Sequence, residues 1–229
     1  MLGLGNAITG GAASGETPWA VTDLSDLAHW FKYNTGLTLS SGDDVETWSD
    51  SYGSETFTLD AGKVWKNNGD LDFIAGTSGG RMELDGTWDP GSFSAYLVLR
   101  LTVATAANEE IMNSGNNDFI RLNNSTTARI KIGNVTSNNM ALPGDEITQN
   151  TWFVLGIEWD GTTIKIYQDT DYANPTTATD TDTFAGIKNL GLRGNQWGGQ
   201  MREVVFINDV LSDSDRENLM THLKTIRDI

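Results

Sequence analysis

The sequence lacks cysteine and has no long run of uncharged apolar residues. The absence of cysteine excludes disulfide scaffolds, thiolate zinc sites, iron–sulfur clusters and cysteine nucleophiles. A membrane-spanning helix needs roughly 18 or more consecutive apolar residues, and no segment reaches that length. The first 15 residues are small and apolar, but they contain no lysine or arginine and glycines interrupt them. We therefore expect no signal peptide and a protein made in a cytoplasm.

Basic residues are scarce, since 15 Lys and Arg stand against 31 Asp and Glu and give a net charge of −16. The cations are spread singly from Lys32 onward, and the nearest approach to a cluster is Arg129 with Lys131. Such a chain repels a phosphate backbone or an anionic membrane surface, so we predict neither nucleic acid nor membrane as a partner. The sequence does contain 38% apolar residues, with 8 Trp and 8 Phe, which suffices for a globular core.

Apolar and polar residues alternate along most of the chain after residue 18, with the period of β-strands. The odd positions of 95–103 are all apolar, which predicts a half-buried strand, and 152–159 alternates in the same way. A two-residue turn at Asp160-Gly161 places Ile157 opposite Ile164 on the core side of a hairpin. Further short strands are expected at 29–33, 71–74, 82–84, 119–122, 129–132 and 202–207. This spacing is typical of an all-β sandwich.

One helix is predicted at the C-terminus. Ser212 has the features of an N-cap, and Asp213 follows it in the first turn, where a carboxylate complements the helix dipole. Leu219, Leu223 and Ile226 form one apolar stripe.

Six segments carry a family resemblance by their order along the chain. They are Asp23-Leu24 with Ala28-His29-Trp30-Phe31, Val45-Glu46-Thr47-Trp48-Ser49-Asp50-Ser51-Tyr52-Gly53, Leu71-Asp72-Phe73, Trp159–Tyr167, Trp197–Val204 and Val210–Asp213. Together they resemble the concanavalin A-like superfamily, and within it the laminin G-like domains. The resemblance implies a two-sheet antiparallel jelly-roll sandwich with a C-terminal helix over residues 19–229, preceded by an extended glycine-rich arm, residues 1–18.

A narrower resemblance concerns Met1–Asn6 and His29–Leu39. These segments are similar to the start of jelly-roll modules in structural proteins of tailed bacteriophages, especially marine and cyanobacterial phages. The arm itself supports two interpretations. A disordered terminus is one. The other is an assembly arm, because the uncharged residues Leu2, Leu4 and Ile8 are costly to leave in water and an extended arm can add to a neighbour's sheet edge.

Catalysis has weak support in the sequence. Some enzymes of this superfamily are glucanases that carry Glu-x-Asp-x-(x)-Glu on one strand face. The nearest segment is 83–89, where Thr87 or Trp88 occupies the place of the second glutamate. The two histidines, His29 and His222, have no evident serine or aspartate partner in the sequence. We therefore predict that the protein is not an enzyme.

Calcium is the one cofactor for which the sequence offers candidates, because hard cations prefer carboxylate oxygens and laminin G-like domains often bind calcium at the sandwich rim. We select Asp169 and Asp171 as candidate ligands. The alternative, which we favour, is a solvated acidic loop. Other aspartates lie close in sequence at Asp43-Asp44 with Asp50, and at Asp180 with Asp182.

Sugar binding requires an aromatic ring with polar side chains beside it. Trp197 follows Arg193 and Asn195, and Trp88 precedes an aspartate. The candidate carbohydrate site therefore consists of Arg193, Asn195, Trp197 and Trp88. For Trp197 we favour the alternative of a packing residue.

The predicted function is that of a non-enzymatic phage virion protein on the capsid, neck, baseplate or tail. We expect it to assemble with other virion proteins and with further copies of itself, and to contact cell-surface polysaccharide of the host. A free glycan-binding module is the alternative, and a degenerate glucanase is the third hypothesis.

Overall fold

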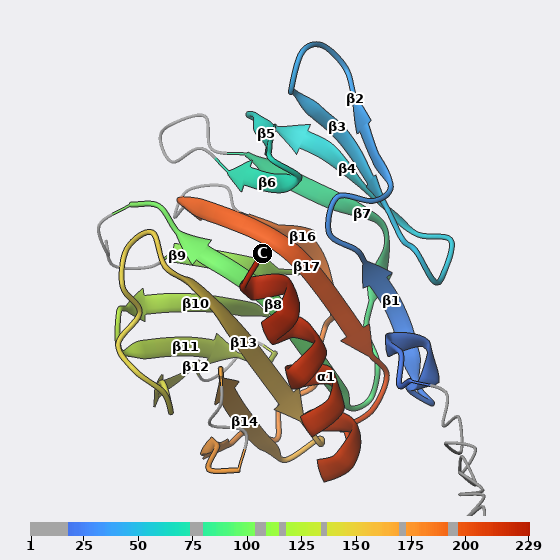
Figure 1. Cartoon of the computed structure of the whole chain (residues 1–229). Helices are drawn as coiled ribbons and strands as arrows, with labels where there is room; N and C mark the ends of the chain where they lie inside the picture. Colours follow the sequence, from blue (N-terminus) through green and yellow to red (C-terminus); the bar gives the residue numbers. More distant parts are fainter. Residues whose placement is uncertain are drawn as a thin grey trace, which may run out of the picture.

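Two antiparallel β-sheets packed face to face, with one helix on the outside, make up the computed structural model (Figure 1). The structure describes residues 18–73, 80–103, 109–114, 118–133, 137–169, 173–191 and 197–229. The arm residues Leu2, Leu4 and Ile8 lie outside these ranges. The described part confirms the predicted fold class, an all-β jelly-roll sandwich with a C-terminal helix.

Sheet A has eight strands. Their order is β15 (Thr176–Thr179), β14 (Thr163–Gln168), β13 (Trp152–Trp159), β8 (Phe93–Leu101), β17 (Gly199–Ile207), β6 (Asp70–Phe73) and β5 (Val64–Asn67), and β1 (Leu27–Phe31) also pairs with β17. A single turn of 3₁₀ helix, Val21–Asp23, precedes β1.

Sheet B has nine strands. Their order is β12 (Ser137–Ala141), β11 (Thr127–Lys131), β10 (Phe119–Asn124), β9 (Glu109–Asn113), β16 (Ile187–Leu190), β7 (Arg81–Trp88), β4 (Thr56–Ala61), β3 (Val45–Ser49) and β2 (Leu37–Leu39). The main core lies between the sheets and is rich in aromatic rings. Its largest buried members include Trp48, Trp197, Phe31, Phe57, Phe73, Phe93 and Phe206.

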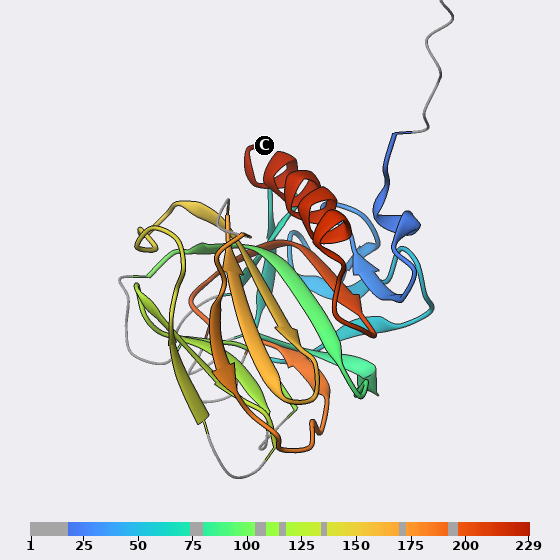
Figure 2. The ribbon, with the colours of Figure 1, turned by 90° about the horizontal axis from the view of Figure 1, so that it is seen from below.

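The helix α1 (Asp213–Arg227) covers the outer face of sheet A, as Figure 2 shows from below. The prediction that the strand at 95–103 is half-buried is therefore wrong. Tyr96 and Val98, on the face predicted to meet solvent, are buried under α1. The helix itself forms as predicted, because Ser212 accepts a hydrogen bond from the N–H of Asp215 and the stripe of Leu219 and Leu223 packs on the sheet.

Charged side chains fasten α1 to sheet A at three points. Arg216 binds the buried carboxylate of Glu158 through Nε and Nη2, at 2.9 and 3.0 Å. His222 pairs through Nε2 with Oε1 of Glu203 at 2.7 Å. Arg202 of β17 donates to two carbonyls in the last turn of the helix, at 2.8 and 2.9 Å. Since buried carboxylates need partners, these contacts fix the position of the helix on the sheet.

The β13–β14 hairpin has the predicted faces but a different register. Ile157 pairs with Ile166, and Trp159 pairs with Ile164, so the predicted two-residue turn is wrong. Oδ1 of Asp160 accepts hydrogen bonds from the N–H groups of the two threonines after Gly161, at 2.9 and 2.7 Å, and this stabilises a longer connection. A register shift of two residues leaves the same side chains facing the core.

In the part of the chain that the structure describes, no helix has the length and apolar character needed to cross a membrane.

Candidate functional site

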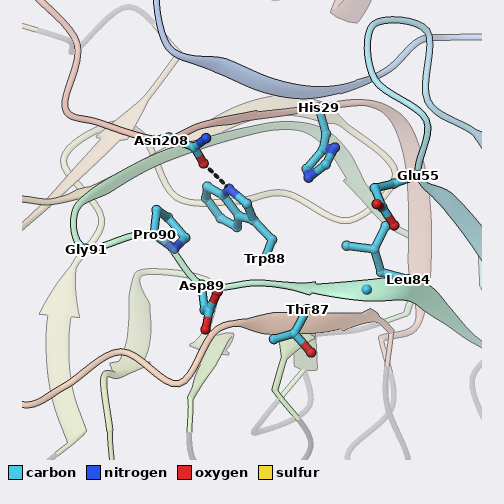
Figure 3. Close-up of a pocket in the computed structure, with 10 residues that line it drawn as sticks. His29, Glu55, Leu84, Thr87, Trp88, Asp89, Pro90, Gly91 and Asn208 are labelled. Carbon is cyan, nitrogen blue, oxygen red and sulfur yellow. Dashed lines mark hydrogen bonds between the residues drawn. The ribbon is translucent and has the colours of Figure 1, made fainter.

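A cleft of about 440 Å³ opens where β1, β7 and the end of β17 meet (Figure 3). It is lined by His29, Glu55, Leu84, Gly86, Thr87, Trp88, Asp89, Pro90, Gly91 and Asn208. In Figure 3 the imidazole of His29 lies between the indole of Trp88 and the carboxylate of Glu55. The cleft brings together polar side chains from segments far apart in the sequence.

His29 is held in the cleft by a buried carboxylate. Its Nδ1 lies 2.9 Å from Oδ2 of Asp50, whose side chain is fully buried. Burial alone would raise the pKa of Asp50, but hydrogen bonds from His29 and from the N–H groups of Trp30, Tyr52 and Gly53 outweigh it and lower this pKa. Asp50 is therefore ionised, so Nδ1 of His29 carries the proton. This fixes the ring and leaves Nε2 for a ligand.

The turn after Trp48 explains this arrangement. The indole of Trp48 is buried and donates to the carbonyls of Lys32 and Thr35, at 3.3 and 3.1 Å. Asp50 then accepts from the backbone of the strand that carries His29. A Cβ at Gly53 would stand 2.6 Å from Oδ2 of Asp50, so only glycine permits the turn to close on the carboxylate.

Trp88 forms a wall of the cleft. One ring face stacks on Phe206 at a centroid distance of 4.4 Å, and the side chain is 5% exposed. Its Nε1 donates to Oδ1 of Asn208 at 2.7 Å. Trp88 thus offers an edge to a ligand, in place of the open stacking face that the sequence suggested. The bond also orients the Asn208 amide, so that its Nδ2 remains a donor.

The charge of the cleft is negative. Glu55 and Asp89 contribute carboxylates, and of the described residues that line the cleft none is lysine or arginine. A Cβ at Gly86 would lie 3.3 Å from the Glu55 carboxylate, so the absence of a side chain there keeps room for Glu55. Carboxylates accept hydrogen bonds from hydroxyl groups and repel anions.

The other predicted sugar residues lie elsewhere. Trp197 is 1% exposed and belongs to the core between the sheets, so its ring has no open face for a sugar. Its position agrees with the packing interpretation. Arg193 and Asn195 lie outside the described residues. Of the four candidates, only Trp88 lines the cleft.

The candidate calcium ligand Asp169 is engaged with the protein. Its Oδ1 accepts from Arg227 at 2.7 Å and from the N–H of Val154 at 3.1 Å. Asp171 lies outside the described residues. Within the described ranges, no group of three or more histidine and acidic side chains is placed to hold a metal ion. Calcium binding by these two aspartates stays a prediction.

Sequence reasoning missed the partners of both histidines, because the carboxylates come from other elements. Asp50 is 21 residues from His29, and Glu203 is 19 residues from His222. The signal for the first pair was present in the Trp48–Gly53 motif, which the family resemblance drew attention to without assigning a role to Asp50.

The fold is that of a concanavalin A-like jelly roll. Residues 75–215 match the family described as the concanavalin A-like lectin/glucanases superfamily, and the chain belongs to this family. No relative was found among curated proteins.

Solved structures share the fold at low sequence identity. The "Binding domain of Botulinum Neurotoxin DC in complex with SialylT" is 16% identical with a TM-score of 0.58, and the match covers 83% of this chain and 52% of that one. The receptor binding domain of botulinum neurotoxin C/D mosaic serotype is 12% identical with a TM-score of 0.64, over 86% and 51%. A mutant of Trypanosoma rangeli sialidase is 11% identical with a TM-score of 0.59, over 88% and 33%. The chain thus spans about half of the toxin domains and a third of the sialidase.

Proposed function

We propose that the protein is a non-enzymatic glycan-binding domain and that the Trp88 cleft is its binding site. The observation that carries this proposal is the convergence in one cleft of an oriented imidazole, an oriented amide and a carboxylate beside an aromatic wall. A sugar presents several hydroxyl groups that both donate and accept, and such a set of side chains matches them. Membership of a superfamily that includes lectins is consistent with this function.

The ligand is a neutral glycan. The cleft holds Glu55 and Asp89 without a lysine or arginine among its described lining residues, and the whole chain carries a net charge of −16. Both features disfavour sialic acids and uronic acids, whose carboxylates would meet like charge. The sialylated ligand named for the toxin domain therefore does not transfer to this chain.

The absence of catalysis is supported by the strand that most resembles a glucanase motif. Glu83 of β7 points away from the core and its Oε1 lies 2.5 Å from Nζ of Lys188. Thr87 occupies the place of a further carboxylate. An engaged glutamate and a missing partner do not supply the acid and nucleophile that glycoside hydrolysis needs.

Replacing His29 by alanine is expected to weaken glycan binding about tenfold, because one oriented hydrogen bond is lost. The measurement is titration of the wild-type and variant proteins with the tightest member of an array of neutral oligosaccharides. His222→Ala is the matched control, since it also removes an imidazole paired with a buried carboxylate, but His222 does not line the cleft. Equal affinity of His29→Ala and wild type would place the binding site elsewhere.

The second part of the proposal is that this domain belongs to a tailed-phage virion and is made in the host cytoplasm. It is supported by the resemblance of Met1–Asn6 and His29–Leu39 to phage jelly-roll modules, and by the uncharged arm with Leu2, Leu4 and Ile8. In this role the protein assembles with other virion proteins and with copies of itself.

Deletion of residues 1–17 is expected to leave a folded domain that no longer enters virions, because the arm supplies the contact with the particle. Mass spectrometry of virions purified from cells that make the full or shortened chain measures this. Incorporation of the shortened chain in unchanged amount would contradict the role of the arm.

A further inference from the structure

Trp65 is the exposed tryptophan of a second cleft. Its side chain is 44% exposed, whereas Trp88 and Trp197 are buried. Because side chains alternate along β5, Val64 faces the core and Trp65 points outward. A cleft of about 370 Å³ surrounds it, and its lining consists of Asp43, Asp44, Trp65, Lys66, Asn67 and Asp72.

The backbone of this cleft is fixed by contacts between the two sheets. The turn between β2 and β3 of sheet B reaches β5 of sheet A, where the carbonyl of Asp43 accepts from the N–H of Lys66 at 2.7 Å. Asp44 and Trp65 also form an isolated antiparallel bridge. The cleft therefore lies where the ends of both sheets are joined, and its shape does not depend on a free loop.

The polar side chain beside the ring is oriented as well. Asp72 of β6 is the cross-strand partner of Trp65. Its Oδ2 accepts from Nε2 of Gln200 at 2.8 Å and lies 3.5 Å from Nδ2 of Asn67. These contacts occupy one carboxylate oxygen and hold the group in place, so that the other oxygen can accept a hydrogen bond from a ligand.

We propose that the Trp65 cleft is a second binding site for a neutral pyranose ring. The C–H groups on one face of such a ring are apolar and weakly positive, and they pack on the electron-rich face of an indole. The hydroxyl groups at the edge of the sugar donate to Asp72, and Asn67 lies beside it. The class of ligand rests on the proposed function, but the two clefts share no lining residue.

Two sites on one domain change how a long glycan is held. A polysaccharide chain that occupies one site presents further sugars to the other at high effective concentration. A short oligosaccharide gains nothing from this. The structure thus assigns to the Trp65 cleft a contribution that grows with the length of the glycan.

Trp65→Ala tests the second site. The protein is passed over immobilised neutral polysaccharide and, separately, titrated with the matching disaccharide while the indole N–H signals are followed by NMR. The variant is expected to lose retention on the polysaccharide about tenfold or more. In the wild type the Trp65 indole signal should shift with the disaccharide. Val210→Ala is the control, because it truncates an apolar side chain that is 37% exposed but lines neither cleft.

The outcomes separate the two sites. If Trp65→Ala is retained on the polysaccharide as strongly as the wild type, and the Trp65 signal of the wild type does not move with the disaccharide, the second site is overturned. The Trp88 cleft is unaffected by that result. Loss of disaccharide binding in His29→Ala without any change at the Trp65 signal would likewise restrict binding to the first cleft. A Trp65 signal that still shifts in His29→Ala supports the second site even if the Trp88 cleft binds nothing.

Discussion

Replacing Glu158 by alanine is expected to lower the free energy of unfolding by about 3–5 kcal/mol, because it leaves the buried Arg216 guanidinium with only the solvent-exposed carboxylate of Asp213 as counter-charge. The Glu158 carboxylate receives two hydrogen bonds from Arg216 and one each from Tyr96 and Tyr167, at 2.7 and 3.0 Å. Burial, followed by the nearby Glu158 charge, raises the pKa of Tyr96, so the phenol stays a donor. The substitution removes the centre of the contact between α1 and sheet A.

Urea denaturation of the wild-type and variant proteins measures this loss. Lys188→Ala is the control, because it also breaks an ion pair, but one whose two side chains are 39% and 34% exposed. Exposed pairs contribute only about 0–1 kcal/mol. If Glu158→Ala cost no more than Lys188→Ala, the contact between Arg216 and Glu158 would not contribute to holding the helix on the sheet.

Replacing Glu110 by glutamine is expected to stabilise the protein at pH 8 by about 3 kcal/mol. Burial raises the pKa of Glu110 from 4.5 to about 7, and the Arg121 charge offsets this only in part. In the unfolded chain the carboxyl ionises from about pH 4.5 upward, whereas the folded protein retains the proton until about pH 7. The folded state therefore loses stability relative to the unfolded state as the pH rises through this interval, and glutamine avoids the loss.

The measurement is the difference in unfolding free energy between Glu110→Gln and wild type from pH 4 to pH 8. We expect almost no difference at pH 4 and the full difference at pH 8. Glu46→Gln serves as the control, since Glu46 is exposed on β3. A difference that did not change with pH would show that the Glu110 carboxyl has the same pKa in the folded and the unfolded protein, and would contradict the shift.

The long strands could be predicted from alternation, and the layer outside them could not. β13 spans the predicted residues, and β8 and β17 overlap their predictions. The second buried face of β8 was missed because Tyr96 has a polar hydroxyl group, which in the structure is satisfied by Glu158 under α1. The pattern of a strand shows which of its side chains are polar, and it cannot show that a helix beginning at Asp213 will cover the polar face.

Short strands were harder to predict, because three or four residues give no period. β2, β5 and β15 are of this kind, and they lie at the ends of the sheets. The same limit explains why Trp65 was not selected: in β5 only Val64 precedes it, and nothing nearby marks Asp72 of the next strand as its partner.

The candidate site was predicted in part. Trp88 was selected as a sugar-binding residue, and it lines the cleft, but as a wall stacked on Phe206. Trp197 has the right neighbours in sequence and lies in the core. The pair of His29 and Asp50 depends on the approach of a turn to a strand, which local patterns do not encode.

The most direct test of the glycan-binding claim is an NMR titration of the indole N–H signals. The chain has 8 Trp, so each signal can be assigned by substitution to phenylalanine. With the tightest neutral oligosaccharide of the array, the account predicts a saturable shift of the Trp88 signal, because its N–H donates to Asn208 in the cleft. The signal of buried Trp48 should stay in place. A Trp88 signal that does not move while the glycan saturates the protein, or an array in which only sialylated members bind, would contradict the account.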